Sequence, residues 1–305
     1  MRYSGIGGQA VMEGVMMKNQ EKYAVAVRKP DQEIIVEVSE YQGVIKNQKI
    51  RNLPILRGVI NFVESLTLGM RTLTFSASFF EEEPEKEKRD KRQEDAMMGG
   101  TVLLSIVLAV GIFMVLPYYL SVFFRRFVAS ETLIALIEGL LRLLIFIGYV
   151  GAISLMPDIR RVYMYHGAEH KCINCIENGM ELTVENVRKS SKQHKRCGTS
   201  FLLIVMVISI VFFMFIRVDS GVLRLLLRLL LIPVIAGVSY EFIRLAGRSD
   251  NALVNLLSKP GLWMQRITTR EPDDDMIEVG IASVEAVFDW RAYVAEQKNQ
   301  EMRIL

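Results

Sequence analysis

The stretch MMGGTVLLSIVLAVGIFMVLPYYLSVFF, from Met97 to Phe124, runs for 28 residues without a charged side chain. A helix needs about 20 predominantly apolar residues to cross the hydrocarbon core of a bilayer. The stretch exceeds that length with no charge to bury. It therefore predicts a transmembrane helix, and it sets the fold class of the chain.

Three further apolar spans follow, at residues 132–156, 200–216 and 222–243. Four such spans are not expected in a soluble domain. The composition agrees, since 51% of the 305 residues are hydrophobic. The sequence thus predicts an α-helical polytopic membrane protein with about four transmembrane helices. The second span carries two charged residues, Glu138 and Arg142, one helical turn apart. We expect them to neutralise each other.

The orientation of the spans is predicted from loop charge, because the first residues contain no apolar stretch typical of a signal peptide. Lysine and arginine concentrate before the first span and in the loop at 157–199. The positive-inside rule then puts both termini and this loop in the cytoplasm of a multi-pass cell-membrane protein. The expected partners are the lipid bilayer and other membrane proteins or peptides, and no nucleic acid. Cysteines in that compartment stay reduced.

The segments outside the spans predict smaller cytoplasmic units. Residues 1–52 alternate apolar and polar residues and predict a β-rich unit. Residues 53–80 have helical periodicity and predict an amphipathic helix, either at the membrane interface or packed against the β-rich unit. The expected order is completed by a charged linker (81–96), two spans (97–156), the loop (157–199), two spans (200–246) and a C-terminal segment (247–305) with an amphipathic helix at 276–297.

All three histidines and all three cysteines lie between His166 and Cys197. If these six residues were distributed at random along the chain, such a cluster would occur with a probability on the order of 10⁻⁴, so we infer a functional site. A helix is expected from residue 158 to Gly179, where His166 and His170 share a face and Glu169 lies close to it. The H-x-x-E-H pattern is typical of sites where two histidines bind Zn²⁺ and the glutamate activates water.

Two ligand sets are compatible with these spacings. The first joins His166 and His170 to His194 and Cys197, which precede the third span. The second is Cys172, Cys175, His194 and Cys197, a closed arrangement that would be structural. Glu241 lies near the cytoplasmic end of the fourth span. It is expected to act as a further ligand, a general base or a hydrogen-bond acceptor, or else to pair with Arg244.

Four motifs give the chain a resemblance to a known family: GGQAVMEGVMM at 7–17, YHGAEHK at 165–171, RCGTSF at 196–201 and PGLWMQRITTREP at 260–272. Together they resemble the bacterial DUF1385 family, which is described as predicted metal-dependent enzymes of the membrane. The resemblance covers nearly the whole chain. The family pattern maps onto His166, Glu169, His170, His194 and Cys197, and also onto Glu13, Gln265, Thr268 and Arg270.

The resemblance favours the histidine-rich ligand set, since Cys172 and Cys175 lie outside the family pattern. It also implies that the N-terminal and C-terminal motifs fold back toward the same cytoplasmic site. Two functions are then expected. One is a zinc-dependent hydrolase that acts on peptides or lipids at the membrane surface, with Glu169 as the base. The other is a non-enzymatic scaffold or assembly factor with a structural metal. A transporter is less supported, because only Glu241 is a well-placed intramembrane acid.

Overall fold

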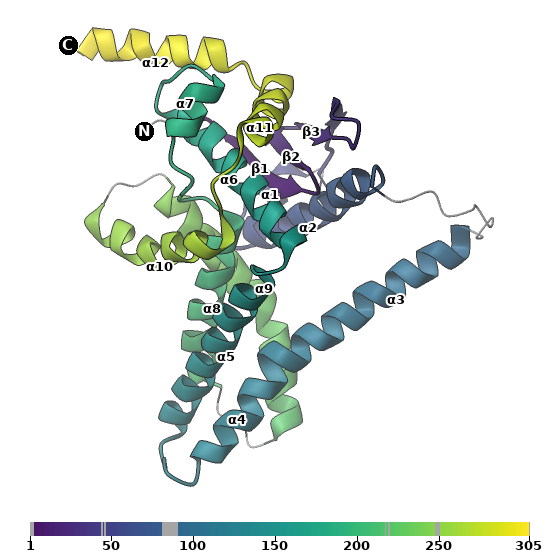
Figure 1. Ribbon diagram of the computed structural model, residues 1–305. Helices are drawn as coiled ribbons and strands as arrows, with labels where there is room; N and C mark the ends of the chain where they lie inside the picture. The colour runs from purple at the N-terminus through teal and green to yellow at the C-terminus, as the bar shows by residue number, and fades with distance from the viewer. Residues whose placement is uncertain are drawn as a thin grey trace.

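The computed structural model describes residues 3–43, 45, 47–80, 91–216, 218, 220–247 and 251–304. It is mostly helical, with a small sheet near the N-terminus. Figure 1 shows two parts: a sheet unit, which we define as strands β1–β4 with helices α6, α7 and α11, and a bundle of the apolar helices α4, α5, α8 and α9. Helix α10 (Ala252–Thr268) runs crosswise where the two parts meet.

The N-terminal sheet is a four-stranded antiparallel meander in the order β1-β2-β3-β4. The strands are Ile6–Val11, Gly14–Asn19, Lys22–Arg28 and Ile34–Glu40. Val11 pairs with Gly14 across a two-residue connection, and Glu13 within it has a φ of 48°. The β-rich character predicted for residues 1–52 is thus found in residues 6–40, and the short helix α1 (Gln48–Arg51) follows.

One face of the sheet is covered by α6 (Pro157–Glu177) and α11 (Asp274–Val287), with α7 (Val184–Lys189) beside them. Their shared core is apolar and includes Met17, Ile173, Ile176 and Ile277. The amphipathic helix expected at 276–297 is divided. α11 ends before Phe288, whose backbone is extended, and the Asp289 carboxylate accepts a hydrogen bond from the Ala292 N–H at the start of α12 (Trp290–Ile304).

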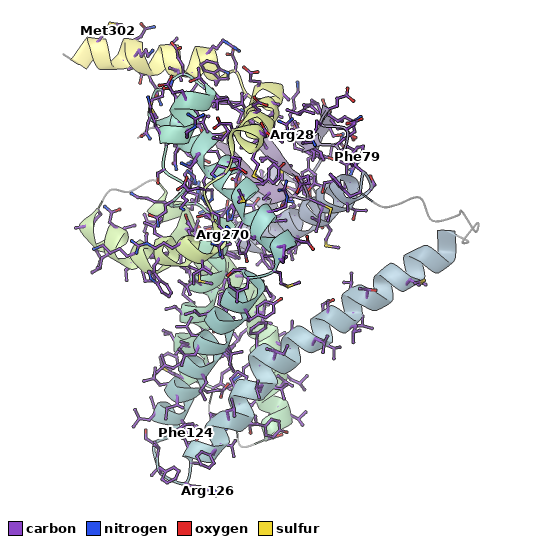
Figure 2. The ribbon with its side chains drawn as sticks, in the orientation of Figure 1. Arg28, Phe79, Phe124, Arg126, Arg270 and Met302 are labelled. Carbon is purple, nitrogen blue, oxygen red and sulfur yellow. The ribbon has the colours of Figure 1, made fainter. Side chains whose placement is uncertain are left out.

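Among the described residues, three helices are long and apolar enough to cross a membrane. They are Gly99–Phe124, which combines part of α3 (Lys91–Val110), a π-helical turn (Gly111–Val115) and α4 (Leu116–Phe124); α5 (Glu131–Ile153); and α9 (Gly221–Ala246). The predicted third span is the shorter helix α8, Gly198–Met214. Phe124 and Arg126 mark the end of the bundle farthest from the sheet unit (Figure 2).

The charged linker predicted at 81–96 falls largely outside the described residues, which resume at residue 91. From there the chain is already helical, since α3 begins at Lys91 rather than at Met97. In Figure 1 this helix leans away from the bundle. Its apolar side chains, including Leu103, Ile106 and Val107, are exposed.

Helix α2 (Leu56–Ala77) exposes apolar residues and buries polar ones. Its exposed side chains include Val63, Leu66, Met70 and Leu73, whereas Glu64, Thr72 and Ser76 are buried. The buried polar groups have partners in the N-terminal unit: Gln9 donates to Thr72 Oγ1 at 2.8 Å, and the Met12 N–H donates to Ser76 Oγ at 3.1 Å. The exposed apolar side chains form a stripe on α2 that no other part of the described chain covers.

An ionic cluster in the bundle joins α5 to α9. The predicted pair of Glu138 and Arg142 is confirmed, with a separation of 2.9 Å. Arg228 of α9 also donates to Glu138, at 2.8 Å from Nη2, and the Arg142 Nε donates to the Phe113 carbonyl at 2.8 Å. All three charged side chains are buried. One carboxylate therefore bridges two guanidinium groups from different helices and offsets one of their two positive charges.

We predict that Glu138→Gln lowers the free energy of unfolding by about 3–5 kcal/mol, because it leaves two buried guanidinium groups without a counter-charge. Thermal unfolding in detergent measures the loss. Glu131→Gln is the matched control, since Glu131 forms an exposed ion pair with Arg125 whose removal should cost about 1 kcal/mol or less. Equal unfolding temperatures for the two variants would contradict the prediction.

Candidate metal centre

Helix α6 carries the H-x-x-E-H motif through the middle of the sheet unit. Pro157 occupies its first turn, where a missing N–H costs nothing, and Gly179 follows its end with a φ of 73°. From Tyr165 to Glu177 nearly every side chain is buried, polar ones included. The helix expected from residue 158 to Gly179 is therefore present, but most of its surface is enclosed by protein.

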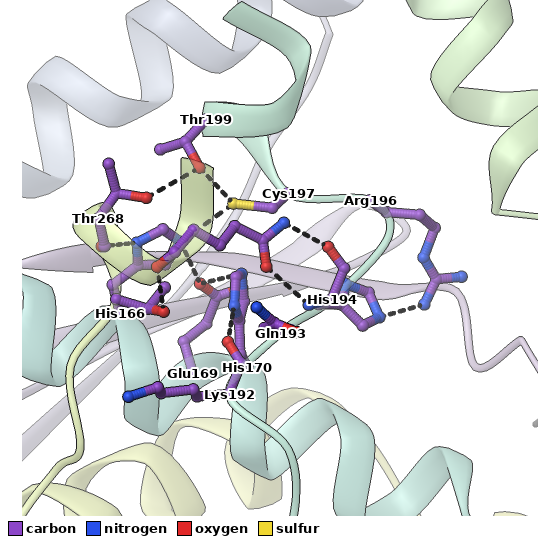
Figure 3. A network of polar contacts seen from close by, with 12 residues as sticks. His166, Glu169, His170, Lys192, Gln193, His194, Arg196, Cys197, Thr199 and Thr268 are labelled. Carbon is purple, nitrogen blue, oxygen red and sulfur yellow. Dashed lines mark hydrogen bonds and ion pairs between the residues drawn. The ribbon is translucent and has the colours of Figure 1, made fainter. Parts of the chain in front are cut away.

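Three potential ligand atoms from two segments converge beside α6 (Figure 3). His166, His170 and Cys197 each offer one atom, and these atoms lie within 4.8 Å of one another. His166 Nε2 is 3.2 Å from Cys197 Sγ, and the two imidazole centroids are 4.4 Å apart. Cys197 is the N-cap residue of α8, so the start of the short apolar helix places the sulfur.

Each imidazole is oriented by a main-chain carbonyl. The Nδ1–H of His166 donates to the Thr268 carbonyl at 2.8 Å, and that of His170 donates to the Lys192 carbonyl at 2.7 Å. A carbonyl can only accept, so each Nδ1 carries a proton, and each Nε2 is the ring atom that faces the other ligand atoms. Metal-binding histidines are held in this way by outer partners.

Two further polar side chains border the three ligand atoms. Glu169 Oε2 is 3.9 Å from Nε2 of both His166 and His170. The Thr199 hydroxyl is 3.1 Å from Cys197 Sγ and 3.2 Å from the Thr268 hydroxyl. The carboxylate thus lies too far from the imidazoles for direct hydrogen bonds, at a distance that leaves room for an ion or a water molecule near all three groups.

The electrostatics of the cluster favour a thiolate. Burial favours the neutral thiol, but the facing His166 and His170 rings outweigh it and hold the pKa of Cys197 well below its usual value. Burial also opposes protonation of His166, yet the Cys197 sulfur and Glu169 together raise the pKa of that imidazole to about 9. A thiolate is the form of cysteine that binds metals.

His194 lies next to the cluster but is turned away from it. Its Nε2 is 3.6 Å from the Glu177 carboxylate and 3.1 Å from an Arg196 nitrogen. Burial raises the pKa of Glu177, but His194 and Arg196 outweigh it and lower this pKa to about 2. The main chain of His194 is clamped by Gln265, which accepts from its N–H at 2.8 Å and donates to its carbonyl at 2.7 Å.

The structure does not bring the C-x-x-C set together. Cys172 and Cys175 are fully buried in the apolar core between α6 and the sheet. Burial raises the pKa of Cys172 well above its usual value and that of Cys175 to about 11, so both remain neutral thiols. Among the described residues, the group that could hold a metal ion draws only Cys197 from the three cysteines.

The remaining predicted site residues divide into two groups. Thr268 and Gln265 belong to the site's support, as described above. Glu13 and Arg270 make their contacts elsewhere. Glu13 pairs with Arg161 at 2.5 Å and accepts from the Tyr165 hydroxyl at 3.2 Å. Arg270 donates to the Ser154 carbonyl at 3.4 Å, where the bundle meets the sheet unit (Figure 2).

Glu241 is neither beside the cluster nor paired with Arg244 in the way the sequence suggested. It accepts from Arg57 Nε at 2.5 Å and thereby ties α2 to α9. This pairing depends on tertiary packing. Because α2 packs along α9, Arg57 on α2 forms the ion pair in place of Arg244 on the same helix as Glu241.

A cavity of about 730 Å³ opens beside the cluster. Its walls come from residues 5–10, from α2, from α6 and from the start of α8, and they include His166, Glu169, His170 and Cys197. The volume lies within the range of about 300–1,000 Å³ typical of ligand sites. Sequence reasoning missed the support from Glu177 and Thr199, although Glu177 lies on the same predicted helix and Thr199 within the RCGTSF motif.

The architecture defines the class of this protein: its described residues form a mostly helical chain with three helices long and apolar enough to cross a membrane, a small antiparallel sheet, and a His–His–Cys cluster facing a cavity. The chain belongs to the DUF1385 family, described as "Protein of unknown function (DUF1385)", which it matches over residues 53–290. The resemblance inferred from the four motifs is confirmed.

A relative in Bacillus subtilis (strain 168), named "Uncharacterized protein YqhQ", is 33% identical to this chain, with 97% of this chain and 95% of the relative covered. The relative therefore extends the similarity to the N-terminal sheet, which precedes the family match. No solved structure matches the chain.

We predict that Gly167→Ala destabilises the protein by about 1–3 kcal/mol, because an added Cβ would meet the Arg270 carbonyl oxygen at 2.0 Å and backbone would have to move. Thermal unfolding measures the effect. Gly151→Ala is the control: this helical glycine has nothing within 4 Å of an added Cβ, so its variant should be unchanged or slightly more stable. A Gly167→Ala protein as stable as wild type would refute the close approach.

Proposed function

We propose that this protein is a multi-pass membrane metalloprotein with a zinc-type site, and that it hydrolyses a substrate at the cytoplasmic surface of the cell membrane. The observation that carries the proposal is the convergence of two carbonyl-anchored imidazoles and a low-pKa cysteine within 4.8 Å. Two nitrogens and one sulfur are a donor set that suits Zn²⁺.

The residues present fit such an ion. His166, His170 and Cys197 would hold it, and a bound Zn²⁺ would polarise a carbonyl and lower the pKa of nearby water. Glu169 is then the general base: its carboxylate accepts a proton from water as the oxygen adds to the substrate carbonyl carbon. When the bond to the leaving nitrogen or oxygen breaks, Glu169 returns that proton to the leaving atom.

The second candidate is a non-enzymatic scaffold or assembly factor with a structural metal. It is favoured by one feature, the proximity of Glu169 to both imidazoles, because a small side-chain movement would make the carboxylate a fourth ligand. A closed site of four protein ligands holds two segments together and performs no chemistry. The two candidates differ in what Glu169 does.

The membrane arrangement in this proposal has four spans, with α8 as the shortest, and both termini in the cytoplasm. The apolar stripe of α2 lies in the interface, in keeping with its exposed Val63, Leu66 and Met70. Helix α10 (Ala252–Thr268) lies there as well, because it packs on α8, runs crosswise in Figure 1, and exposes Leu253, Leu256 and Trp263.

We predict that His166→Ala and Cys197→Ser each lower zinc affinity by about 100-fold or more, since removing even an outer partner of a ligand costs about 10–100-fold. Chelator competition and elemental analysis measure this. The Cys172→Ala, Cys175→Ala double variant should retain its zinc. His194→Ala tests the fourth predicted ligand, and we expect an unchanged zinc content because its Nε2 faces Glu177. Zinc retained by His166→Ala but lost by the double variant would overturn the assignment.

Glu169→Gln separates the two candidate functions. If Glu169 is the base, the variant keeps zinc and stability but loses hydrolysis by about 10²–10⁴-fold. An untargeted comparison of lipids and membrane peptides in cells that carry either protein provides the readout. If Glu169 is a fourth ligand, zinc affinity falls in the same variant and the two profiles match, which would favour the scaffold.

Trp263 reports on the interfacial position of α10. In a Trp290→Phe protein reconstituted in vesicles, we expect lipids with brominated acyl chains to quench Trp263 fluorescence strongly, because its ring is exposed on the apolar side of α10. The matched control is Trp263→Phe, in which the remaining Trp290 is buried near the sheet and should be little quenched. Equal quenching in both proteins would argue against the arrangement.

A further inference from the structure

Strand β1 is an edge of the sheet, and it lines the same cavity as the metal-binding residues. The strand order leaves one side of β1 without a neighbouring strand. Residues 5–10 border the cavity together with His166, Glu169, His170 and Cys197. An edge strand presents a row of backbone donors and acceptors that can pair with another extended chain.

Side-chain contacts identify which residues of β1 direct their backbone groups away from β2. The Ile6 N–H donates to Ser4 Oγ at 3.3 Å, and the Met12 N–H, just beyond the strand, donates to Ser76 Oγ at 3.1 Å. Every second residue of a strand directs its backbone N–H and C=O groups toward the same edge. Gly8 and Ala10 therefore share this direction, and within the described chain their outward N–H and C=O groups have no hydrogen-bond partner.

Gly8 brings this open edge against the metal-binding helix. A Cβ on Gly8 would lie 3.1 Å from Glu169 Cγ and 2.4 Å from the Met16 carbonyl oxygen, so only glycine permits the approach. Gly8 is also exposed. Toward its C-terminal end, β1 lies beside α2: the Gln9 side chain donates to Thr72 Oγ1, and the Met12 N–H, just after the strand, donates to Ser76 Oγ. The open segment is thus short and lies at the end of the strand nearest to Glu169.

We propose that the substrate is an extended polypeptide, which binds as an additional strand along Gly8 and Ala10 and so carries a backbone carbonyl past Glu169. This inference rests on the proposed function, because it names the substrate class of the same cavity. Alternating donors and acceptors on Gly8 and Ala10 match a peptide backbone, which has the same alternation. A phospholipid headgroup offers acceptors and no such row.

The test uses backbone amide exchange in the full-length Glu169→Gln protein, which keeps the peptide intact. The protein is labelled with ¹⁵N-glycine and ¹⁵N-alanine, and the probe is an octapeptide of alternating threonine and valine. We expect exchange at Gly8 and Ala10 to slow by about tenfold or more. Gly7 is the internal control, because its N–H already faces β2. An octapeptide of proline lacks every backbone donor and cannot pair as a strand, so it should protect neither amide.

Absence of protection at saturating threonine–valine peptide, or equal protection by the proline peptide, would overturn the proposal. Zinc content is measured on the same samples. Loss of peptide protection with zinc binding intact would reject the substrate class alone, whereas protection without zinc binding would reject the metal site and leave the strand-binding edge.

Discussion

The burial of two imidazole rings and a thiolate at one point constrains the structure around it. Polar groups removed from water must find partners, and charged ones must find counter-charges. Here four segments meet. α6 supplies the two rings and the residue before α8 supplies the sulfur, while the Lys192 carbonyl accepts from His170 and the Thr268 carbonyl accepts from His166. The loop before α8 and the end of α10 are held in place by these bonds.

A second electrostatic requirement operates at the other end of the molecule. Glu138 faces Arg142 and Arg228 in an apolar bundle, where removing one partner leaves a buried charge uncompensated. Two helices of the bundle connect the two polar centres: α5 leads into α6, and α8 follows directly after its N-cap residue Cys197. The packing of α8 in the bundle thereby determines the position of the Cys197 sulfur.

Much of the fold follows from hydropathy and periodicity. The long uncharged stretch at Met97 and the one-turn spacing of His166 and His170 are local features, so the sequence predicts them directly. The rotation of His194 toward Glu177 and the pairing of Glu241 with Arg57 were not predictable, because they depend on how α6 meets the following loop and on how α2 lies along α9. Nor does periodicity reveal that α2 would bury Thr72 and expose Leu66.

The two hydrogen bonds between Gln265 and the His194 main chain constrain the order in which parts of the protein fold. Gln265 and Thr268 follow every apolar span in the sequence, so they leave the ribosome after the last of these helices has been made. Chains are synthesised from the N-terminus, and their earlier parts fold first. The cluster on α6 and α8 therefore waits for the end of α10, and its final geometry is reached only when the helices before it are already in place.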